Sequence, residues 1–331
     1  MQHEPELAAA LAAIRPAMAL CRSVQGSIDD AVLEKDDRSP VTVADYGSQA
    51  LVCRSLAASR PSDPVVAEEE AGALRRPEQS TFLARVGREL ASVGVEAEGK
   101  TICDWIDRGS SQPCQRFWTL DPIDGTKGFL RKGHYAVALA LIIDGRVEVA
   151  ALGCPQLGDP AAGGLVYWAV KDQGARVAPV GNPNDSRPVQ VSDCQDMRLA
   201  RLCESVESAH SAHDRSARIA EDLGLGGQPV RLDSQAKYAT VADGAAEIYL
   251  RLPVNDTYRE KIWDHAAGAL VVSEAGGQVS DTHGRPLDFS LGRTLSANRG
   301  VVVTNGPLHE RVLDAVLAST PSDQHGDGNH D

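Results

Sequence analysis

Four groups of carboxylates stand where a strand or loop is expected to meet a helix, away from the solvated faces of helices. They are Asp45 in SPVTVADYGSQ (39–49), Glu68–Glu70 in VVAEEEAG (65–72), Asp121 and Asp124 in WTLDPIDGTKGFL (118–130), and Asp264 in KIWDHAAGALVVSEAGG (261–277). Hard cations such as Mg²⁺ prefer carboxylate and carbonyl oxygens as ligands. The joint occurrence of the four groups favours chemistry at a bound cation.

The third group carries the strongest local signal. Asp121 and Asp124 follow an apolar strand and stand beside Pro122 and Gly125, which predicts a rigid, tight turn. Thr126 then begins a helix, where its hydroxyl could cap the helix or do chemistry. The spacing is not that of an EF-hand loop. Taken alone, such a segment is more often an acidic turn with a helix cap.

The other groups also have structural explanations when each is taken alone. Glu68–Glu70 could be a solvated run of charge, Asp264 could cap the helix that it opens, and Asp45 could be a charge favoured by a helix dipole. Only the combination argues for a shared site.

The elements that must position these residues follow from hydrophobic periodicity and turn residues. In the first half we expect helices over 4–25 and 42–60, and strands over 64–67, 117–120, 135–144, 146–153 and 164–170. Residues 72–116 are polar, with a helix expected over 82–95, and the segment is expected to be an insertion, not a core layer. In the second half short strands and helices alternate, over 200–204, 211–223, 230–232, 234–243, 246–252, 264–275, 301–304 and 306–318. This is an α/β pattern.

The segment PVGNPNDSRP (179–188) is dense in turn residues, so we place a domain boundary there. The prediction is an N-terminal α+β subdomain over 1–188 and a C-terminal α/β subdomain over 189–319. Residues 320–331 lack apolar side chains and are expected to be a disordered tail.

Composition and charge narrow the possible functions. The 331 residues carry 33 Lys and Arg against 46 Asp and Glu, a formal net charge of −13, and 42% are hydrophobic. Such a chain can bury a core, which excludes disorder over its whole length. The acidic balance argues against polymeric nucleic acid, whose binding needs a cationic surface. An anionic small ligand would also be repelled unless a tightly held cation reverses the local charge.

The cysteines and the N-terminus indicate the compartment. Seven cysteines occur without a CxxC pair, which is typical of free thiols in a reducing compartment and unlike a zinc site. The first residues include Glu4 and Glu6 and no basic region, so no signal peptide is expected. No run approaches the roughly 18 apolar residues of a membrane span. We therefore predict a cytoplasmic protein with no membrane partner.

The motifs resemble those of the lithium-sensitive, magnesium-dependent phosphatase superfamily that includes inositol monophosphatases and fructose-1,6-bisphosphatases. Beyond the acidic motifs, the resemblance to its 3′(2′),5′-bisphosphate nucleotidase branch rests on SAHSAHD (208–214), DSQAKY (233–238), YLRLP (249–253), EKIWDHAAG (260–268) and PLDFSLGRTL (286–295). It covers roughly residues 8–318. The resemblance implies a layered αβαβα sandwich of mixed α+β and α/β type, with the metal site between two subdomains.

Carried over residue by residue, the resemblance implies a complete metal centre, most of it in the N-terminal subdomain. Glu68 would bind a metal ion, with Glu69 nearby. Asp121 would bridge two ions, Ile123 would offer its carbonyl oxygen, and Asp124 and Asp264 would hold the second ion. Asp45 and Thr126 would form the dyad that activates the attacking water. Glu70 is a departure, since relatives commonly have Ser there.

The same resemblance implies a mechanism. Two or three Mg²⁺ ions would lower the pKa of the attacking water and stabilise the leaving alkoxide. The metal-activated water would attack the phosphorus in line, without a phospho-enzyme, and Thr126 would relay a proton to Asp45. Inhibition by lithium is also implied.

A bisphosphate substrate needs a site for its second phosphate, and the C-terminal half supplies candidates. Ser234 and Lys237 are expected at the start of one helix, where backbone N–H groups favour an anion, and Arg251 ends a strand. His210, Ser211 and His213 precede or open the helix predicted over 211–223. Taken alone, Lys237 or Arg251 is more often a solvated surface charge, and the histidines could be caps or surface residues.

Three functions therefore stand against one another. The first is a phosphatase that converts adenosine 3′,5′-bisphosphate to AMP and phosphate, and that could also act on 3′-phosphoadenosine 5′-phosphosulfate. The second is an inositol monophosphate or polyphosphate phosphatase with the same metal centre. The third is a catalytically dead metal or nucleotide sensor, which nothing in the sequence favours. The partner is a small nucleotide in the first case, and the chain would be a monomer or homodimer.

Overall fold

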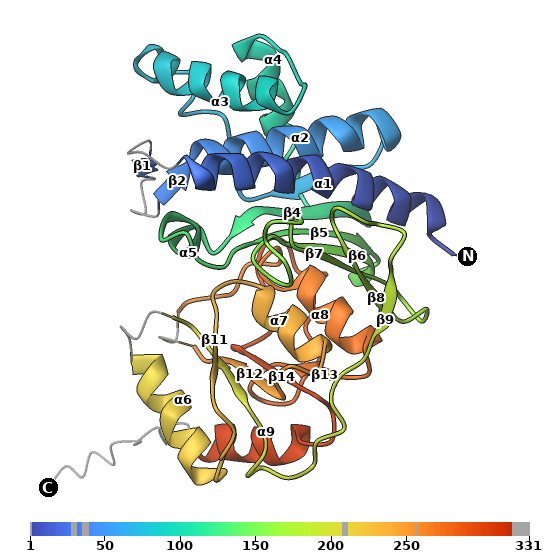
Figure 1. Cartoon of the computed structure of the whole chain (residues 1–331), viewed down its shortest axis with the longest axis vertical. Coiled ribbons are helices and arrows are strands. Elements are labelled where there is room, and N and C mark those ends of the chain that lie inside the picture. The colour runs from blue at the N-terminus through green and yellow to red at the C-terminus, as the bar shows by residue number, and fades with distance from the viewer. Residues whose placement is uncertain are drawn as a thin grey trace, which may run out of the picture.

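A computed structural model of the chain describes residues 2–27, 32–34, 40–206, 211–253, 255 and 257–319, with side chains over 2–27, 42–206, 214–253, 255 and 257–319. The tail predicted over 320–331 lies outside the described residues. Figure 1 shows helices and sheets stacked in alternating layers along the long axis of the molecule.

The larger sheet has seven strands. In order across the sheet they are β3 (Val65–Ala67), β4 (Arg116–Asp124), β5 (Ala136–Ile143), β6 (Arg146–Cys154), β7 (Leu165–Val170), β8 (Ala175–Pro179) and β9 (Arg187–Val189). The β3–β4 pair is parallel and the remaining pairs are antiparallel. The expected turn between β5 and β6 is present, with φ of 50° at Asp144 and 73° at Gly145.

The smaller sheet has five strands from the second half of the chain. In order across the sheet they are β11 (Val230–Arg231), β10 (Leu202–Glu204), β12 (Ile248–Arg251), β14 (Val301–Thr304) and β13 (Gln278–Ser280). Strands β11, β10 and β12 are parallel, whereas β14 runs antiparallel to both of its neighbours. A separate short ribbon pairs β1 (Val32–Glu34) with β2 (Pro40–Thr42).

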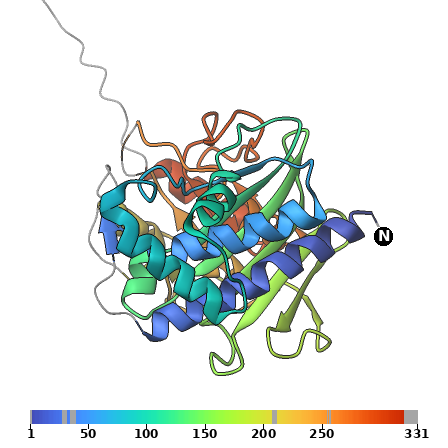
Figure 2. The same ribbon diagram turned by 90° about the horizontal axis from the view of Figure 1, so that it is seen from above.

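The helices cover the faces of both sheets. They are α1 (Glu4–Gly26), α2 (Val43–Ser59), the 3₁₀ helix η1 (Pro77–Gln79), α3 (Ser80–Ser92), α4 (Gly99–Asp107), α5 (Thr126–Leu130), α6 (Ser211–Asp222), α7 (Ala236–Ala242), α8 (Ala266–Glu274) and α9 (His309–Ala318). Helices α1 and α2 lie side by side across one face of the larger sheet (Figures 1 and 2). Helices α7 and α8 fill the space between the sheets, and α6 and α9 cover the far side of the smaller one. The layered αβαβα architecture expected from the resemblance is confirmed.

Strand β5 explains why the central sheet is buried on both faces. Val137, Leu139 and Leu141 pack in the core beneath α1 and α2. The small side chains of Ala138 and Ala140 face the other core, which contains α7 and α8. Successive side chains of a strand alternate between faces, so a strand covered on both sides reads as a continuous apolar run.

Two expectations about the first half need correction. Residues 72–116 are not merely an insertion, because α3 and α4 pack on α2 and bury Val86, Leu90, Ile102 and Ile106 in the first core. The strand predicted over 117–120 continues to Asp124, and its pairing with β5 is irregular between Asp121 and Asp124. The acidic motif therefore lies on an irregular strand end.

The segment over 179–188 connects β8 to β9 inside one sheet, and the chain enters the smaller sheet only after Val189. The division into subdomains at 188 and 189 stays a prediction. All seven cysteines, each within the described residues, are free thiols.

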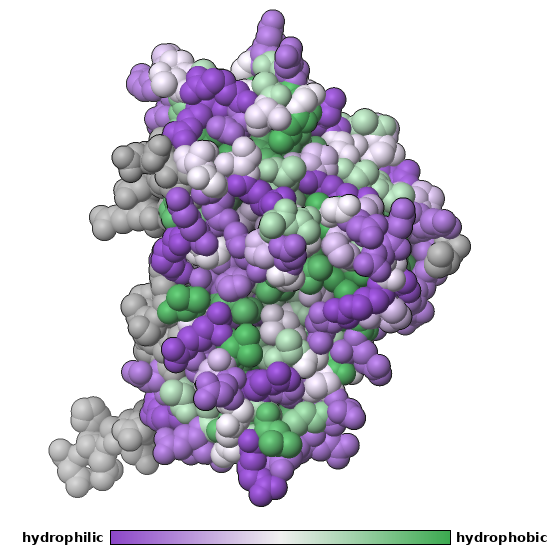
Figure 3. All heavy atoms as spheres, viewed as in Figure 1, coloured by the Kyte–Doolittle hydropathy of each residue, from purple (hydrophilic) through white to green (hydrophobic). Residues whose placement is uncertain are grey.

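Within the described residues, α1 is the one helix long and apolar enough to cross a membrane, and half of its most apolar window is buried against the rest of the protein. Core helices of globular proteins have the same length and composition, so α1 is only weak evidence for a membrane-spanning helix. On the face in Figure 3 hydrophilic residues predominate, and the hydrophobic ones form small separate patches.

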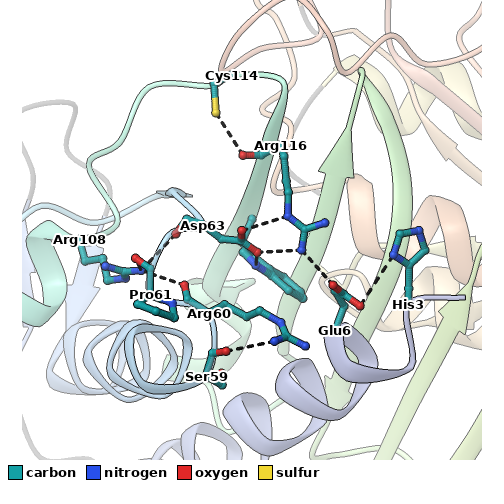
Figure 4. A network of polar contacts seen from close by, with 10 residues as sticks. His3, Glu6, Ser59, Arg60, Pro61, Asp63, Arg108, Cys114 and Arg116 are labelled. Carbon is teal, nitrogen blue, oxygen red and sulfur yellow. Dashed lines mark hydrogen bonds and ion pairs between the residues drawn. The ribbon is translucent and has the colours of Figure 1, made fainter.

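A buried carboxylate outside the acidic motifs ties α2 to the larger sheet (Figure 4). Arg116 donates Nε and Nη2 to the two oxygens of Asp63 at 3.0 and 2.9 Å, and Trp118 donates its indole N–H at 3.0 Å. Burial by itself would raise the pKa of Asp63, but these donors outweigh it and hold the pKa below its usual value. The charged form is therefore the one that stabilises the fold.

We expect Asp63→Asn to lower the free energy of unfolding at pH 7 by about 1–3 kcal/mol, the usual range for hydrogen bonds to charged groups. Because the folded pKa is lowered, this contribution is present above the unfolded value of about 4 and is lost as the pH falls through the folded value. Urea unfolding from pH 7 to pH 3 measures it. The control Asp104→Asn breaks an exposed pair with Arg75 and should cost less than about 1 kcal/mol. Equal losses in the two variants would contradict the prediction.

Candidate active site

One face of α2 holds the acidic motifs together. Thr42 caps the helix in a reciprocal capping box with Asp45, whose Oδ2 accepts hydrogen bonds from the Thr42 amide and hydroxyl at 2.7 and 2.6 Å. Residues three and four positions apart share a helix face, so Asp45, Ser48 and Gln49 point the same way. Ser48 donates to the carbonyl of Pro122 at 2.8 Å, which fixes the end of β4 against the helix.

The structure brings Asp45 and Thr126 together. Asp45 is buried, and its other carboxylate oxygen, Oδ1, lies 3.3 Å from the hydroxyl of Thr126, which is the first residue of α5. The same hydroxyl lies 3.3 Å from the carbonyl oxygen of Ile123. Gly125 makes this approach possible, because its φ is 88° and a Cβ there would come within 2.9 Å of Ser234. Asp45 also has the structural role that the sequence allowed, because its Oδ2 caps the start of α2 while its Oδ1 lies beside Thr126.

Asp121 lies at the irregular end of β4 with its side chain buried. Its Oδ1 accepts the amide N–H of Ile123 at 3.0 Å. Burial raises the pKa of Asp121 well above its ordinary value, and the nearby charges of Glu68, Asp124 and Asp264 raise it further. The charges of carboxylates from three segments distant in sequence therefore act on one another.

The loop that carries Glu68 is held by an amide that sequence reasoning missed. Gln49 accepts the backbone N–H of Glu69 at 3.0 Å and donates to the Glu69 carbonyl at 2.6 Å. Two residues further on, the amide of Ala71 donates to Asp107 at 2.8 Å. Gln49 stands four residues after Asp45 in the same motif, and that helical spacing was the available signal.

Asp264 precedes α8, and a second missed amide connects it to Asp124. The backbone N–H of Gln235 donates to Asp124 at 2.5 Å, while its side chain donates to the Trp263 carbonyl and accepts the Gly268 amide. Burial raises the pKa of Asp264, and the charges of Asp124 and Glu68 add to the shift. Like charges confined in a buried space fit a bound divalent cation, which would offset their repulsion.

A tighter acidic group lies beside these carboxylates. Among the described residues, Glu260, Asp264 and His265 have ligand atoms within 4.8 Å of one another. Two of the three already have protein partners, because His265 lies 3.2 Å from Glu260 and 2.7 Å from the hydroxyl of Tyr238. The pairing of Glu260 and His265 favours a structural role for these two residues, whereas Asp264 interacts with the charge of Asp124 on β4.

A cavity of about 420 Å³ opens from the acidic centre between the two halves of the chain, lined among others by Asp124, Asp264, Lys237, Arg251, Tyr249 and Arg131. Lys237 is buried and donates to Ser205 at 3.2 Å and to the Leu232 carbonyl at 3.4 Å. Its ammonium lies 5.1 Å from the centre of the Tyr249 ring, a cation–π distance. Burial lowers the pKa of Lys237.

The other predicted substrate residues have mixed outcomes. Arg251 donates Nε to Glu260 at 3.3 Å and lines the cavity. Ser234 also lines the cavity, but its helix does not offer the expected free N–H groups. Helix α7 begins only at Ala236, whose amide donates to the Ser234 hydroxyl at 3.2 Å, and the Gln235 amide is taken by Asp124.

Three substrate predictions fall where the structure gives no side-chain description. His210 lies outside the described residues. Ser211 and His213 lie in the first turn of α6, but their side chains are not described. Tyr238, the last residue of the DSQAKY motif, is fully buried.

Comparison with known proteins agrees with this architecture of two sheets around an acidic centre. The model of the inositol monophosphatase family matches residues 2–320. The chain is 42% identical to the 3′(2′),5′-bisphosphate nucleotidase of Emericella nidulans over 96% of this chain and 98% of that one. It is 41% identical to that of Schizosaccharomyces pombe over 98% of each, and 43% identical to that of Oryza sativa over 94% of this chain and 93% of the other.

Solved structures show the same fold. An IMPase from Thermotoga maritima has a TM-score of 0.66 at 20% identity, covering 95% of this chain and 97% of that one. CysQ from Bacteroides thetaiotaomicron, a bacterial member of the inositol monophosphatase family, has a TM-score of 0.60 at 19% identity, covering 92% and 98%. The class is thus a layered α/β phosphatase with an acidic centre. The chain belongs to the inositol monophosphatase family, whose members are metal-dependent, and the family predicted from the motifs is confirmed.

Proposed function

We propose that this protein hydrolyses the 3′-phosphate of adenosine 3′,5′-bisphosphate to give AMP and phosphate, and that 3′-phosphoadenosine 5′-phosphosulfate is a second substrate. The observation that carries the proposal is one cavity lined both by the carboxylates of Asp124 and Asp264 and by the cations Lys237 and Arg251. Such a cavity suits a ligand with a reacting phosphate, held through metal ions, and a second anionic group held by the cations. The similarity to 3′(2′),5′-bisphosphate nucleotidases from other organisms supports the same choice.

The residues present fit two or three Mg²⁺ ions. Glu68, Asp121, Asp124, Asp264 and the carbonyl of Ile123 would hold them, because they supply hard oxygen ligands and an excess of buried negative charge. When bound, the ions supply charge stabilisation at the phosphoryl oxygens and lower the pKa of water.

Thr126 and Asp45 would move the proton of the attacking water. The Thr126 hydroxyl donates to Asp45 Oδ1 and so keeps a lone pair free to accept the water proton. Asp45 is fixed by its capping-box bonds and needs no reorganisation to receive that proton. The water oxygen bonds to phosphorus as the bond to the 3′-oxygen breaks, and the leaving oxygen takes up a proton to become the hydroxyl of AMP.

Phosphate release tests the proposal against its alternative, an inositol monophosphate or polyphosphate phosphatase, which is the activity that names the family. We expect Mg²⁺-dependent release from adenosine 3′,5′-bisphosphate that lithium inhibits, with kcat/KM at least about tenfold above that for inositol 1-phosphate. AMP is the matched control, because it carries the 5′-phosphate and lacks the 3′-phosphate. Faster turnover of inositol 1-phosphate would favour the alternative, and nucleotide binding without release would indicate a sensor.

The remaining features extend the proposal. The protein is a cytoplasmic monomer or homodimer with subdomains over 1–188 and 189–319, and its partner is the small nucleotide, with neither polymeric nucleic acid nor a membrane as a partner. Mass analysis in solution and cell fractionation test these statements.

A further inference from the structure

Arg293 belongs to PLDFSLGRTL (286–295), a motif to which the catalytic arrangement above gives no role. Its backbone is fastened to the segment that leads into Asp264. The amide of Ile262 donates to the Arg293 carbonyl at 3.2 Å, and the amide of Leu295 donates to the Glu260 carbonyl at 2.8 Å. An isolated β-bridge joins the residues between them. Arg293 is therefore fixed to the Asp264 segment through the backbone.

The side chain of Arg293 reaches the other half of the site. Its Nη2 donates to the carbonyl of Ala67 at 2.7 Å, across 226 positions of sequence. The guanidinium also stacks 4.8 Å from the centre of the Trp263 ring. Ala67 directly precedes Glu68, and Trp263 directly precedes Asp264. One planar cation thus contacts the residue before each of two proposed metal ligands.

Charge at the site favours this arrangement. Arg293 is partly buried, and the carboxylate of Glu70 is its nearby counter-charge. This charge interaction suggests a role for the third glutamate of the Glu68–Glu70 run. Arginine keeps its charge in such surroundings, and its fork of donors can bond a carbonyl while its plane stacks on a ring.

We propose that Arg293 is a positioning residue that holds the Glu68 loop against the Asp264 segment and thereby sets the affinity of the site for a divalent cation. The inference rests on the proposed function for the identity of the two ligands. The Glu68 loop is tied on its own side by Gln49, so Arg293 supplies the tie from the opposite half. Groups that orient metal ligands typically change metal affinity 10-fold to 100-fold when removed.

The test is calorimetric titration of the full chain with Mg²⁺ alone, without nucleotide. We expect Arg293→Gln to raise the Kd for Mg²⁺ roughly 10-fold to 100-fold. Arg293→Lys should lie between this variant and the wild type, because an ammonium can donate to Ala67 but cannot also stack its plane on Trp263. At saturating Mg²⁺ the KM for the nucleotide should stay within about twofold of the wild-type value.

Arg285→Gln is the matched control, since it removes the same charge from an exposed position eight residues away and should leave the Kd unchanged. The thermal midpoint of unfolding, measured in EDTA, shows whether each variant folds. If Arg293→Gln does not fold, the Mg²⁺ affinity of Arg293→Lys tests the inference instead. Wild-type affinity in the Arg293 variant that folds, or an equal loss in Arg285→Gln, would overturn the inference. Glu68→Gln and Asp264→Asn separate the two claims. If Glu68→Gln and Asp264→Asn bind Mg²⁺ with wild-type affinity, the ligand assignment is wrong and the inference fails with it. If these two variants lose Mg²⁺ affinity but the Arg293 variant does not, only the inference about Arg293 is refuted.

Discussion

Replacing Asp121 with Asn should lower Mg²⁺-dependent phosphate release by roughly three orders of magnitude. Bound metal ions typically stabilise the transition state of such reactions by several kcal/mol. Each 1.36 kcal/mol of lost stabilisation lowers the rate about tenfold. Asp121 is buried, and the charges of Glu68, Asp124 and Asp264 all act on it. An amide keeps the shape and can still accept the Ile123 N–H, but it cannot balance the positive charge of a bound cation. Turnover of adenosine 3′,5′-bisphosphate measures the loss.

A stability measurement distinguishes this loss from misfolding. Removing one of several buried like charges relieves repulsion, so metal-free Asp121→Asn should unfold at the same temperature as the wild type or a higher one. Millimolar Mg²⁺ should stabilise the wild type and should stabilise the variant less, because ligands that bind only the folded state stabilise by mass action. Asp144→Asn removes a charge from an exposed hairpin turn and should change neither property. Normal Mg²⁺-dependent turnover in Asp121→Asn would show the assignment to be wrong.

Replacing Lys237 with Met should impair recognition of the second phosphate. Lys237 is buried and lines the same cavity as Asp124 and Arg251, and in the proposed binding mode it binds the second phosphate. A hydrogen bond to a charged group is worth about 1.5–3 kcal/mol, so we expect KM for adenosine 3′,5′-bisphosphate to rise about tenfold to a hundredfold at saturating Mg²⁺. Methionine keeps most of the volume of the buried chain, which limits the loss of stability.

The selectivity of the effect is the decisive part. Adenosine 3′-monophosphate lacks the 5′-phosphate, so its KM should be nearly the same in Lys237→Met and in the wild type. Lys171→Met is the matched control, because Lys171 pairs with the exposed Asp172 and does not line the cavity. An equal rise in KM for both nucleotides would mean that Lys237 supports the cavity as a whole and does not read the second phosphate.

Much of the fold was predictable because its signals are local. The β5–β6 hairpin follows from two apolar runs around Asp144 and Gly145, and α2 begins one residue from its predicted start because Thr42 and Asp45 form a capping box. The packing of α3 and α4 was missed, although Val86 and Leu90 stand four residues apart, as on one face of a helix. The polar composition of residues 72–116 favoured the prediction of an insertion over that of a core layer, because the apolar periodicity is short.

The sequence by itself determined which residues can do chemistry: the carboxylates, the threonine at a helix start, and the family to which their motifs belong. Only the tertiary structure decided which of them meet. Gln49, Gln235 and Arg293 hold the site through contacts to Glu69, Asp124 and Ala67. Helical spacing places Gln49 on the same face as Asp45, but no local pattern indicates which distant group each of the three residues contacts. The physical reason is that periodicity and turn chemistry relate residues only a few positions apart. A guanidinium that bonds a carbonyl 226 positions away is placed by the packing of two sheets around α7 and α8.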